Sequence, residues 1–215
     1  MEVLLAQGQD RPEQGLVARV AGVLRAGGVA VLPTDSVYGI CCAATPNNPA
    51  HERIFEVKRR DRAQTLPWFV ADASDLDVYG VDVPDWARRL AERHWPGALT
   101  LVVRASAAVP AEYAQPGADG PTIALRVPGS ELDRAIVRAL GRPVAQTSAN
   151  LHGAPSATSG AGLDPAVAAA VDLVVDAGPA PVGVASTIVD ATGATPRVLR
   201  EGALAEAEVL LASRH

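Results

Sequence analysis

Residues 12–33 read PEQGLVARVAGVLRAGGVAVLP, and the change of pattern within this stretch decides the fold class. Its first part carries apolar residues at the three- and four-residue spacing of an amphipathic helix, namely Leu16, Val17, Val20, Val23 and Leu24. Gly27 and Gly28 end the helical pattern, and the apolar run VAVLP at 29–33 that follows is typical of a buried strand. A helix that leads directly into a buried strand predicts an α/β protein.

The rest of the chain repeats this alternation. Further strands are expected at 66–71, 99–104, 122–127, 143–147, 172–176, 186–190 and 197–200, and further helices at 47–59, 84–94, 130–140, 164–171 and 203–213. The short spacing of the strands near 98–127 implies antiparallel pairs, whereas helices between strands cover the faces of a sheet. We therefore expect a twisted sheet of parallel and antiparallel strands flanked by helices. No break in composition marks a second domain, so residues 1–215 are expected to form a single domain.

Composition and charge exclude several classes of protein. The chain has 215 residues, of which 48% are hydrophobic, and its 19 basic and 24 acidic residues give a net charge of −5. An acidic chain is a poor general binder of nucleic acid, so any contact with RNA is expected to be weak and local. The sequence shows neither a signal peptide nor an 18-residue apolar run, and adjacent Cys41 and Cys42 suit neither a disulfide nor a metal site. These features predict a cytoplasmic protein with no membrane partner.

Lys58 is the single lysine among the 19 basic residues, and it opens the basic segment KRRDR at 58–62. Cations at a helix C-terminus gain from the helix dipole, so a solvated helix end is one interpretation. The other is a polyphosphate clamp, in which lysine supplies a point charge and arginine a two-pronged donor.

Three other polar groups have two interpretations each. The segment PTDSVYG at 33–39 follows a predicted strand, where open sheets place ligands, but it also suits a capped turn. Arg126 interrupts an apolar strand and needs either a bound anion or a structural partner among nearby carboxylates. The loop after the strand in 143–158 could cradle an anion or form ordinary turns.

Several familiar catalytic motifs are missing from the sequence. It contains no GxxxxGK[ST], no GxGxxG after a strand, no HExxH or CxxC, and no GxSxG. A P-loop, a protein-bound metal and a serine nucleophile are therefore not expected. Catalysis would depend on positioning and electrostatics.

Taken together, seven segments resemble, in order, the motifs of the YrdC-like family of L-threonylcarbamoyladenylate synthases. They are PTDSVYGI (33–40), KRRDRAQTL (58–66), WPGALTLVV (95–103), IALRVP (123–128), PVAQTSANLHGAPSAT (143–158), STIVD (186–190) and VLREG (198–202). The resemblance implies the YrdC-like fold in its short, single-domain bacterial form. It also implies a nucleotidyltransferase that condenses L-threonine, bicarbonate or CO2, and ATP to threonylcarbamoyl-AMP and pyrophosphate, with Mg²⁺ carried by the substrate phosphates.

The resemblance also assigns residues. It implies catalytic roles for Lys58 and Arg60, and threonine binding by Thr34, Arg126, Gln146 and Ser186. It implies ATP binding by Lys58, Arg60, Gln64, Thr122, Ser148, Asn150, Ser156 and Arg200. The product would feed a downstream tRNA threonylcarbamoyltransferase complex.

Two alternative functions stay open from the sequence. The first is an RNA-binding or ribosome-associated paralogue that retains the cleft but not the reaction. The second is carbamoyl transfer to another small acceptor.

Overall fold

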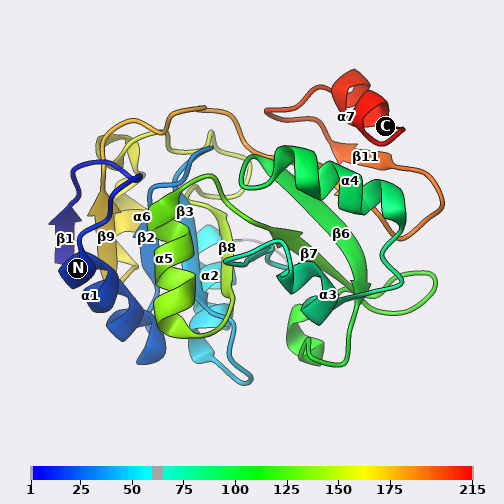
Figure 1. Cartoon of the computed structure of the whole chain (residues 1–215). Coiled ribbons are helices and arrows are strands. Elements are labelled where there is room, and N and C mark those ends of the chain that lie inside the picture. The colour runs from blue at the N-terminus through cyan, green and yellow to red at the C-terminus, as the bar shows by residue number, and fades with distance from the viewer. Residues whose placement is uncertain (1, 60–64, 215) are drawn as a thin grey trace.

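The computed structural model describes residues 2–59 and 65–214, so Arg60 and Gln64 lie outside the described residues. In the described part of the chain, eleven strands form one sheet in the order β1-β9-β2-β3-β8-β4-β7-β6-β10-β11, with β5 paired to β6 (Figure 1). The strands are β1 (Glu2–Leu5), β2 (Ala30–Leu32), β3 (Gly39–Ala43), β4 (Trp68–Phe69), β5 (Gly80–Val81), β6 (Leu99–Ala105), β7 (Thr122–Arg126), β8 (Val144–Ser148), β9 (Leu173–Asp176), β10 (Thr187–Asp190) and β11 (Arg197–Arg200).

The sheet mixes parallel and antiparallel pairs, which confirms the predicted fold class. β1, β9 and β2 are parallel neighbours, β3 and β8 run antiparallel to their neighbours, and β4 with β7 and β6 with β10 are again parallel pairs. The helices are α1 (Gln14–Arg25), α2 (Pro49–Lys58), α3 (Asp75–Tyr79), α4 (Asp85–His94), α5 (Glu131–Leu140), α6 (Pro165–Ala169) and α7 (Glu206–Ala212), with 3-10 turns at Ala111–Tyr113 and Gly160–Gly162. None of the described helices has the length and apolarity needed to cross a membrane.

Side-chain and backbone chemistry sets the ends of α2 and α5. Asn48 caps α2 by accepting a hydrogen bond from the backbone N–H of Ala50, and Arg59 ends it in the left-handed conformation. Ser130 caps α5 by accepting from Asp133 N–H, and Gly141 ends it at a φ of +73°. The α2 end fixes the position of Lys58.

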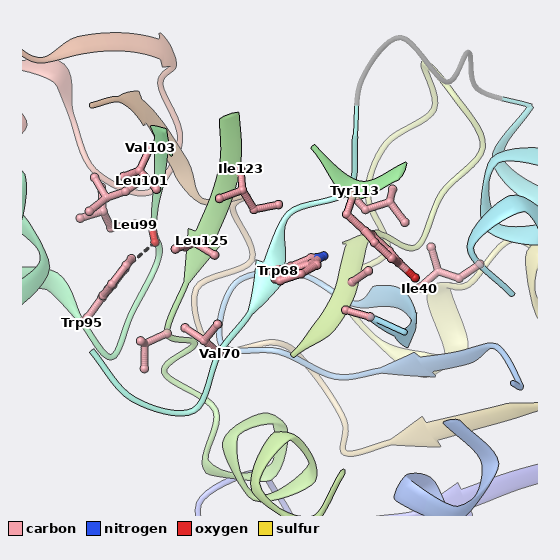
Figure 2. Close-up of a cluster of buried hydrophobic side chains, with 14 of the residues drawn as sticks. Ile40, Trp68, Val70, Trp95, Leu99, Leu101, Val103, Tyr113, Ile123 and Leu125 are labelled. Atoms are coloured by element: carbon pink, nitrogen blue, oxygen red, sulfur yellow. Dashed lines mark hydrogen bonds between the residues drawn. The ribbon is translucent and has the colours of Figure 1, made fainter. Parts of the chain in front are cut away.

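The two faces of the sheet are packed differently. On one face, Trp68, Tyr113, Leu101 and their neighbours form the larger core, and Figure 2 shows these side chains together with Trp95, whose Nε1 donates to Leu99 O at 2.7 Å. On the other face, α1 and α5 lie side by side over β2, β3 and β8 and form a second core (Figure 1). Apolar burial on both faces explains why central strands such as β3 carry no alternating pattern.

We predict that Leu101→Ala destabilises the protein by about 2–5 kcal/mol, because Leu101 is fully buried and its removal leaves a cavity in the larger core. Leu211→Ala is the matched control, since Leu211 is 58% exposed and should cost less than about 0.5 kcal/mol. Urea denaturation of both variants measures the difference. Equal losses would contradict the assignment of Leu101 to the core.

Candidate functional site

A cavity of about 570 Å³ lies on the same face of the sheet as α5, over β8, β4, β7, β6 and β10. Polar side chains from widely separated segments line it. Nine residues assigned by the resemblance are among them: Thr34, Lys58, Thr122, Arg126, Gln146, Ser148, Asn150, Ser186 and Arg200. Ser156 is not among the lining residues, and Arg60 and Gln64 fall outside the described part of the chain.

Arg126, at the end of β7, has the structural carboxylate partner that one of the two interpretations expected. It is 3% exposed, and its Nη2 donates to both carboxylate oxygens of Asp35 at 2.8 Å. Its Nη1 donates to Ser36 Oγ and its Nε to Gly97 O, each at 2.9 Å, while the Phe69 ring lies 5.1 Å away. Arg126 therefore forms a structural ion pair with Asp35 and also lines the cavity.

The PTDS turn after β2 is organised around the hydroxyl of Thr34. Thr34 Oγ1 accepts from the N–H groups of Ser36 and Val37 and donates to Val37 O at 2.7 Å. This is the capped turn that one interpretation of the segment expected. Thr34 and Ser36 are both 1% exposed and line the cavity, so the turn also contributes to the site.

Lys58 does not lie at a solvated helix end, because it is 3% exposed. Its Nζ donates to Ser148 O, to Asn150 O at 2.8 Å and to Asn150 Oδ1 at 3.1 Å. An ammonium group has three N–H donors, and these contacts join the end of α2 to the loop that follows β8. Lys58 thus holds that loop against the cavity.

A third group of polar side chains lies at the β10 and β11 side. Ser186 Oγ and Thr100 Oγ1 are hydrogen-bonded at 2.9 Å, and Arg200 Nη2 donates to Ser186 O at 2.7 Å. Thr122 Oγ1 donates to Gln115 O at 3.2 Å. Thr100 lines the cavity although no role was predicted for it from the sequence. A hydroxyl within the apolar run LTLVV is the signal that could have identified Thr100.

Gln146 differs from the other polar residues of the site. It is 2% exposed and lines the cavity, yet neither its Nε2 nor its Oε1 has a hydrogen-bond partner within residues 2–59 and 65–214. Buried side-chain amides are almost always paired, so such a group requires an explanation.

A buried carboxyl lies behind Arg126. Asp133, in the first turn of α5, is 3% exposed, and its burial raises its pKa to about 8. The Asp35 carboxylate adds to this rise, whereas the Ser130 hydroxyl and the guanidinium groups of Arg126 and Arg134 oppose it.

The described residues contain no group of three or more His, Cys, Asp or Glu side chains that could hold a metal ion.

The fold and the cavity define a class: α/β proteins with a polar cavity built directly on the face of a mixed sheet. A family model described as "Telomere recombination", covering the Sua5, YciO and YrdC proteins, matches residues 22–202. The chain belongs to this Sua5/YciO/YrdC family.

Individual relatives agree with this membership. A protein of Pyrococcus abyssi named threonylcarbamoyl-AMP synthase is 35% identical over 94% of this chain and 58% of its own length. A crystal structure of Sua5 from P. abyssi with L-threonine superposes with a TM-score of 0.87 at 33% identity, covering 99% of this chain and 61% of that one. The protein YciO of Escherichia coli, named as uncharacterized, is 32% identical over 90% of this chain and 92% of its own length. The chain spans somewhat over half the length of the first two relatives.

We predict that Asp133→Asn raises the free energy of unfolding at pH 7 by more than about 1 kcal/mol. Because the folded pKa is raised to about 8 from an ordinary value of 3.8, the unfolded chain ionises first. Below about pH 4 the carboxyl of Asp133 is protonated in both the folded and the unfolded chain, so it does not lower the free energy of unfolding. As the pH rises towards 8, the unfolded chain gains from ionisation and the wild type loses stability. Urea denaturation between pH 4 and pH 8 should show a gap between variant and wild type that widens with pH.

The exposed Asp10→Asn is the control and should show no such widening. A constant gap, or a destabilised Asp133→Asn at pH 8, would argue against a neutral buried carboxyl.

Proposed function

We propose that this protein is an L-threonylcarbamoyladenylate synthase, an enzyme that condenses L-threonine, bicarbonate or CO2, and ATP. The observation that carries the proposal is the cavity, which nine of the residues assigned by the resemblance line together. The name of the P. abyssi relative and the threonine in the Sua5 structure support the same substrate class.

In the proposed reaction, the ammonium group of threonine loses a proton to solvent and becomes a free amine. The amine nitrogen forms a bond to the carbon of CO2 and loses a second proton, which gives a carbamate. A carbamate oxygen then attacks the α-phosphorus of ATP, and the bond from that phosphorus to pyrophosphate breaks. Negative charge accumulates on the leaving pyrophosphate, and preorganised cations and N–H donors stabilise it. Mg²⁺ carried by the phosphates would neutralise part of that charge.

The side chains divide between the two substrates. Arg126 would bind the threonine carboxylate through the cavity-facing side of its guanidinium, while Asp35 and Gly97 O fix the orientation of that group. Thr34 and Ser186 would hold the rest of the amino acid. Nucleotide binding would fall to Lys58, Arg60, Gln64, Thr122, Ser148, Asn150, Ser156 and Arg200.

Lys58 has a particular place in this scheme. Its contacts to Ser148 O and Asn150 O hold a loop that lines the cavity, where we expect the nucleotide to bind. We infer that Lys58 both positions this loop and supplies positive charge near the phosphates. A guanidinium is larger and its charge is more diffuse, so arginine would not replace it.

We further propose that residues 1–215 act as one catalytic domain in the cytoplasm, where the product passes to a tRNA threonylcarbamoyltransferase complex. The buried, unbridged thiols of Cys41 and Cys42 support a reducing compartment. A second candidate is a paralogue that keeps the fold without this reaction, because membership of the family does not by itself determine the chemistry of the site.

The purified protein is expected to release pyrophosphate from ATP only when L-threonine, bicarbonate and Mg²⁺ are all present. Omission of threonine or bicarbonate should reduce release to background, because the attacking oxygen belongs to the carbamate. A coupled pyrophosphate assay with mass spectrometry of threonylcarbamoyl-AMP measures both products. No dependence on threonine or bicarbonate would sink the proposal. Salt-sensitive tRNA binding without ATP binding would favour the paralogue, and product formation with another amine would favour a different acceptor.

Lys58→Arg should lower turnover by about 10- to 100-fold, because the bulkier group displaces the loop at residues 148–150. Arg59→Lys is the matched control, since Arg59 is exposed and the exchange preserves the charge next to the site. Steady-state kinetics and thermal melting of both variants test this. Wild-type turnover in Lys58→Arg would remove Lys58 from the nucleotide site.

A further inference from the structure

We propose that Gln146 is the specificity-determining residue for the carboxylated amine: its side-chain amide binds the N–H and C–O groups of the threonine carbamate as a pair. The inference rests on the proposed synthase function and deepens it, since it assigns a binding group to the intermediate rather than to threonine or ATP.

The amide of Gln146 is built into the site without a protein partner. It is 98% buried on the cavity wall, and both of its polar atoms lack hydrogen bonds to the described residues. A buried amide left unpaired is unfavourable for the free protein. A ligand that offers one donor and one acceptor would satisfy both atoms.

Gly39 makes room for this amide. A Cβ atom at Gly39 would lie 2.1 Å from Gln146 Nε2 and 2.7 Å from its Cγ and Cδ. Gly39 is the β3 residue paired with Ser148, whereas Gln146 itself is paired with Cys41. The amide therefore lies against the β3 backbone in the direction of Ser148.

The sheet register sets the order of binding groups across the cavity. Phe69 of β4 pairs with Arg126 of β7 on one side and with Val144 of β8 on the other, so Arg126 lies level with Val144. Gln146 and Ser148 follow on the same face, each about 7 Å further along the strand. The order is Arg126, then Gln146, then Ser148 with Lys58.

The reaction product has its groups in the same order. The threonine carboxylate comes first, the carbamate N–H and carbonyl come next, and the α-phosphate follows. With the carboxylate on Arg126 and the phosphates beside Lys58 and Ser148, the carbamate falls at Gln146. The geometry therefore assigns Gln146 to the carbamate by the position of its side chain as well as by its chemistry.

The hydrogen-bonding pattern distinguishes the carbamate from its precursors. An amide offers an acceptor oxygen beside an N–H donor. A carbamate offers an N–H beside a C–O acceptor, so both pairs are satisfied at once. Free threonine carries an ammonium group, which has donors only and would leave Gln146 Nε2 unpaired.

The test compares wild type with Gln146→Met, which is close in length and lacks the amide, and Gln146→Glu, which lacks the donor and carries negative charge. Isothermal titration measures L-threonine binding with and without sodium bicarbonate. In the wild type, bicarbonate should tighten threonine binding. Both variants should lose this tightening.

Kinetics supply a second readout. The KM for bicarbonate should rise by about 10-fold or more in Gln146→Met, while the KM for ATP stays unchanged. The melting temperature of ligand-free Gln146→Met should equal or exceed that of the wild type, because an unpaired amide has been removed. Gln14→Met, at an exposed site on α1, is the control and should leave all readouts unchanged.

Two outcomes overturn the assignment. Bicarbonate-dependent tightening that persists in Gln146→Met, or a rise in the KM for ATP alone, shows that the amide does not bind the carbamate. A wild-type protein with neither bicarbonate-dependent binding nor pyrophosphate release overturns the proposed function itself. The two failures are distinguished by the behaviour of the wild type.

Discussion

The buried ion pair between Arg126 and Asp35 is the interaction on which the site depends. It joins the end of β7 to the turn after β2, and Gly97 O and Ser36 Oγ complete the set of acceptors around the guanidinium. A buried pair of charges is costly unless further hydrogen bonds accompany it, and here the neighbouring turn supplies them. The pair fixes where a carboxylate could bind, and the positions of Gln146 and Ser148 follow from the register of the strands between.

Much of the fold could be predicted from the sequence, and the exceptions have physical causes. The alternation of helical and apolar patterns predicted the mixed sheet and most of its strands. The strand Gly39–Ala43 was not predicted, because GICCA is buried on both faces and carries no period. The strand expected at 66–71 is only Trp68–Phe69, since pairing with β7 and β8 ends there.

The site was predicted in part, because its membership follows from motifs whereas its contacts do not. The partner of Arg126 is 91 residues away in the sequence, so only the folded chain could show that the ion pair and the cavity coexist. The basic run at 58–62 suggested charge near phosphates. It gave no indication that the Lys58 ammonium would be buried against the carbonyls of Ser148 and Asn150. The unpaired state of Gln146 is likewise invisible until strand register and Gly39 are known.

The site also shows where the fold tolerates unfavourable burial. Asp133 lies behind Arg126 with a pKa raised to about 8, and Gln146 lies beside the cavity without partners. Both sit next to well-packed layers. Asp133 lies in the first turn of α5, whose apolar residues belong to the second core, and Trp68 with its neighbours packs the opposite face of the sheet. Buried polar groups without partners are retained only where the surrounding packing holds them. For Gln146, which lines the cavity, this is what a preorganised binding site requires, because a group already stripped of water gains most when the ligand arrives.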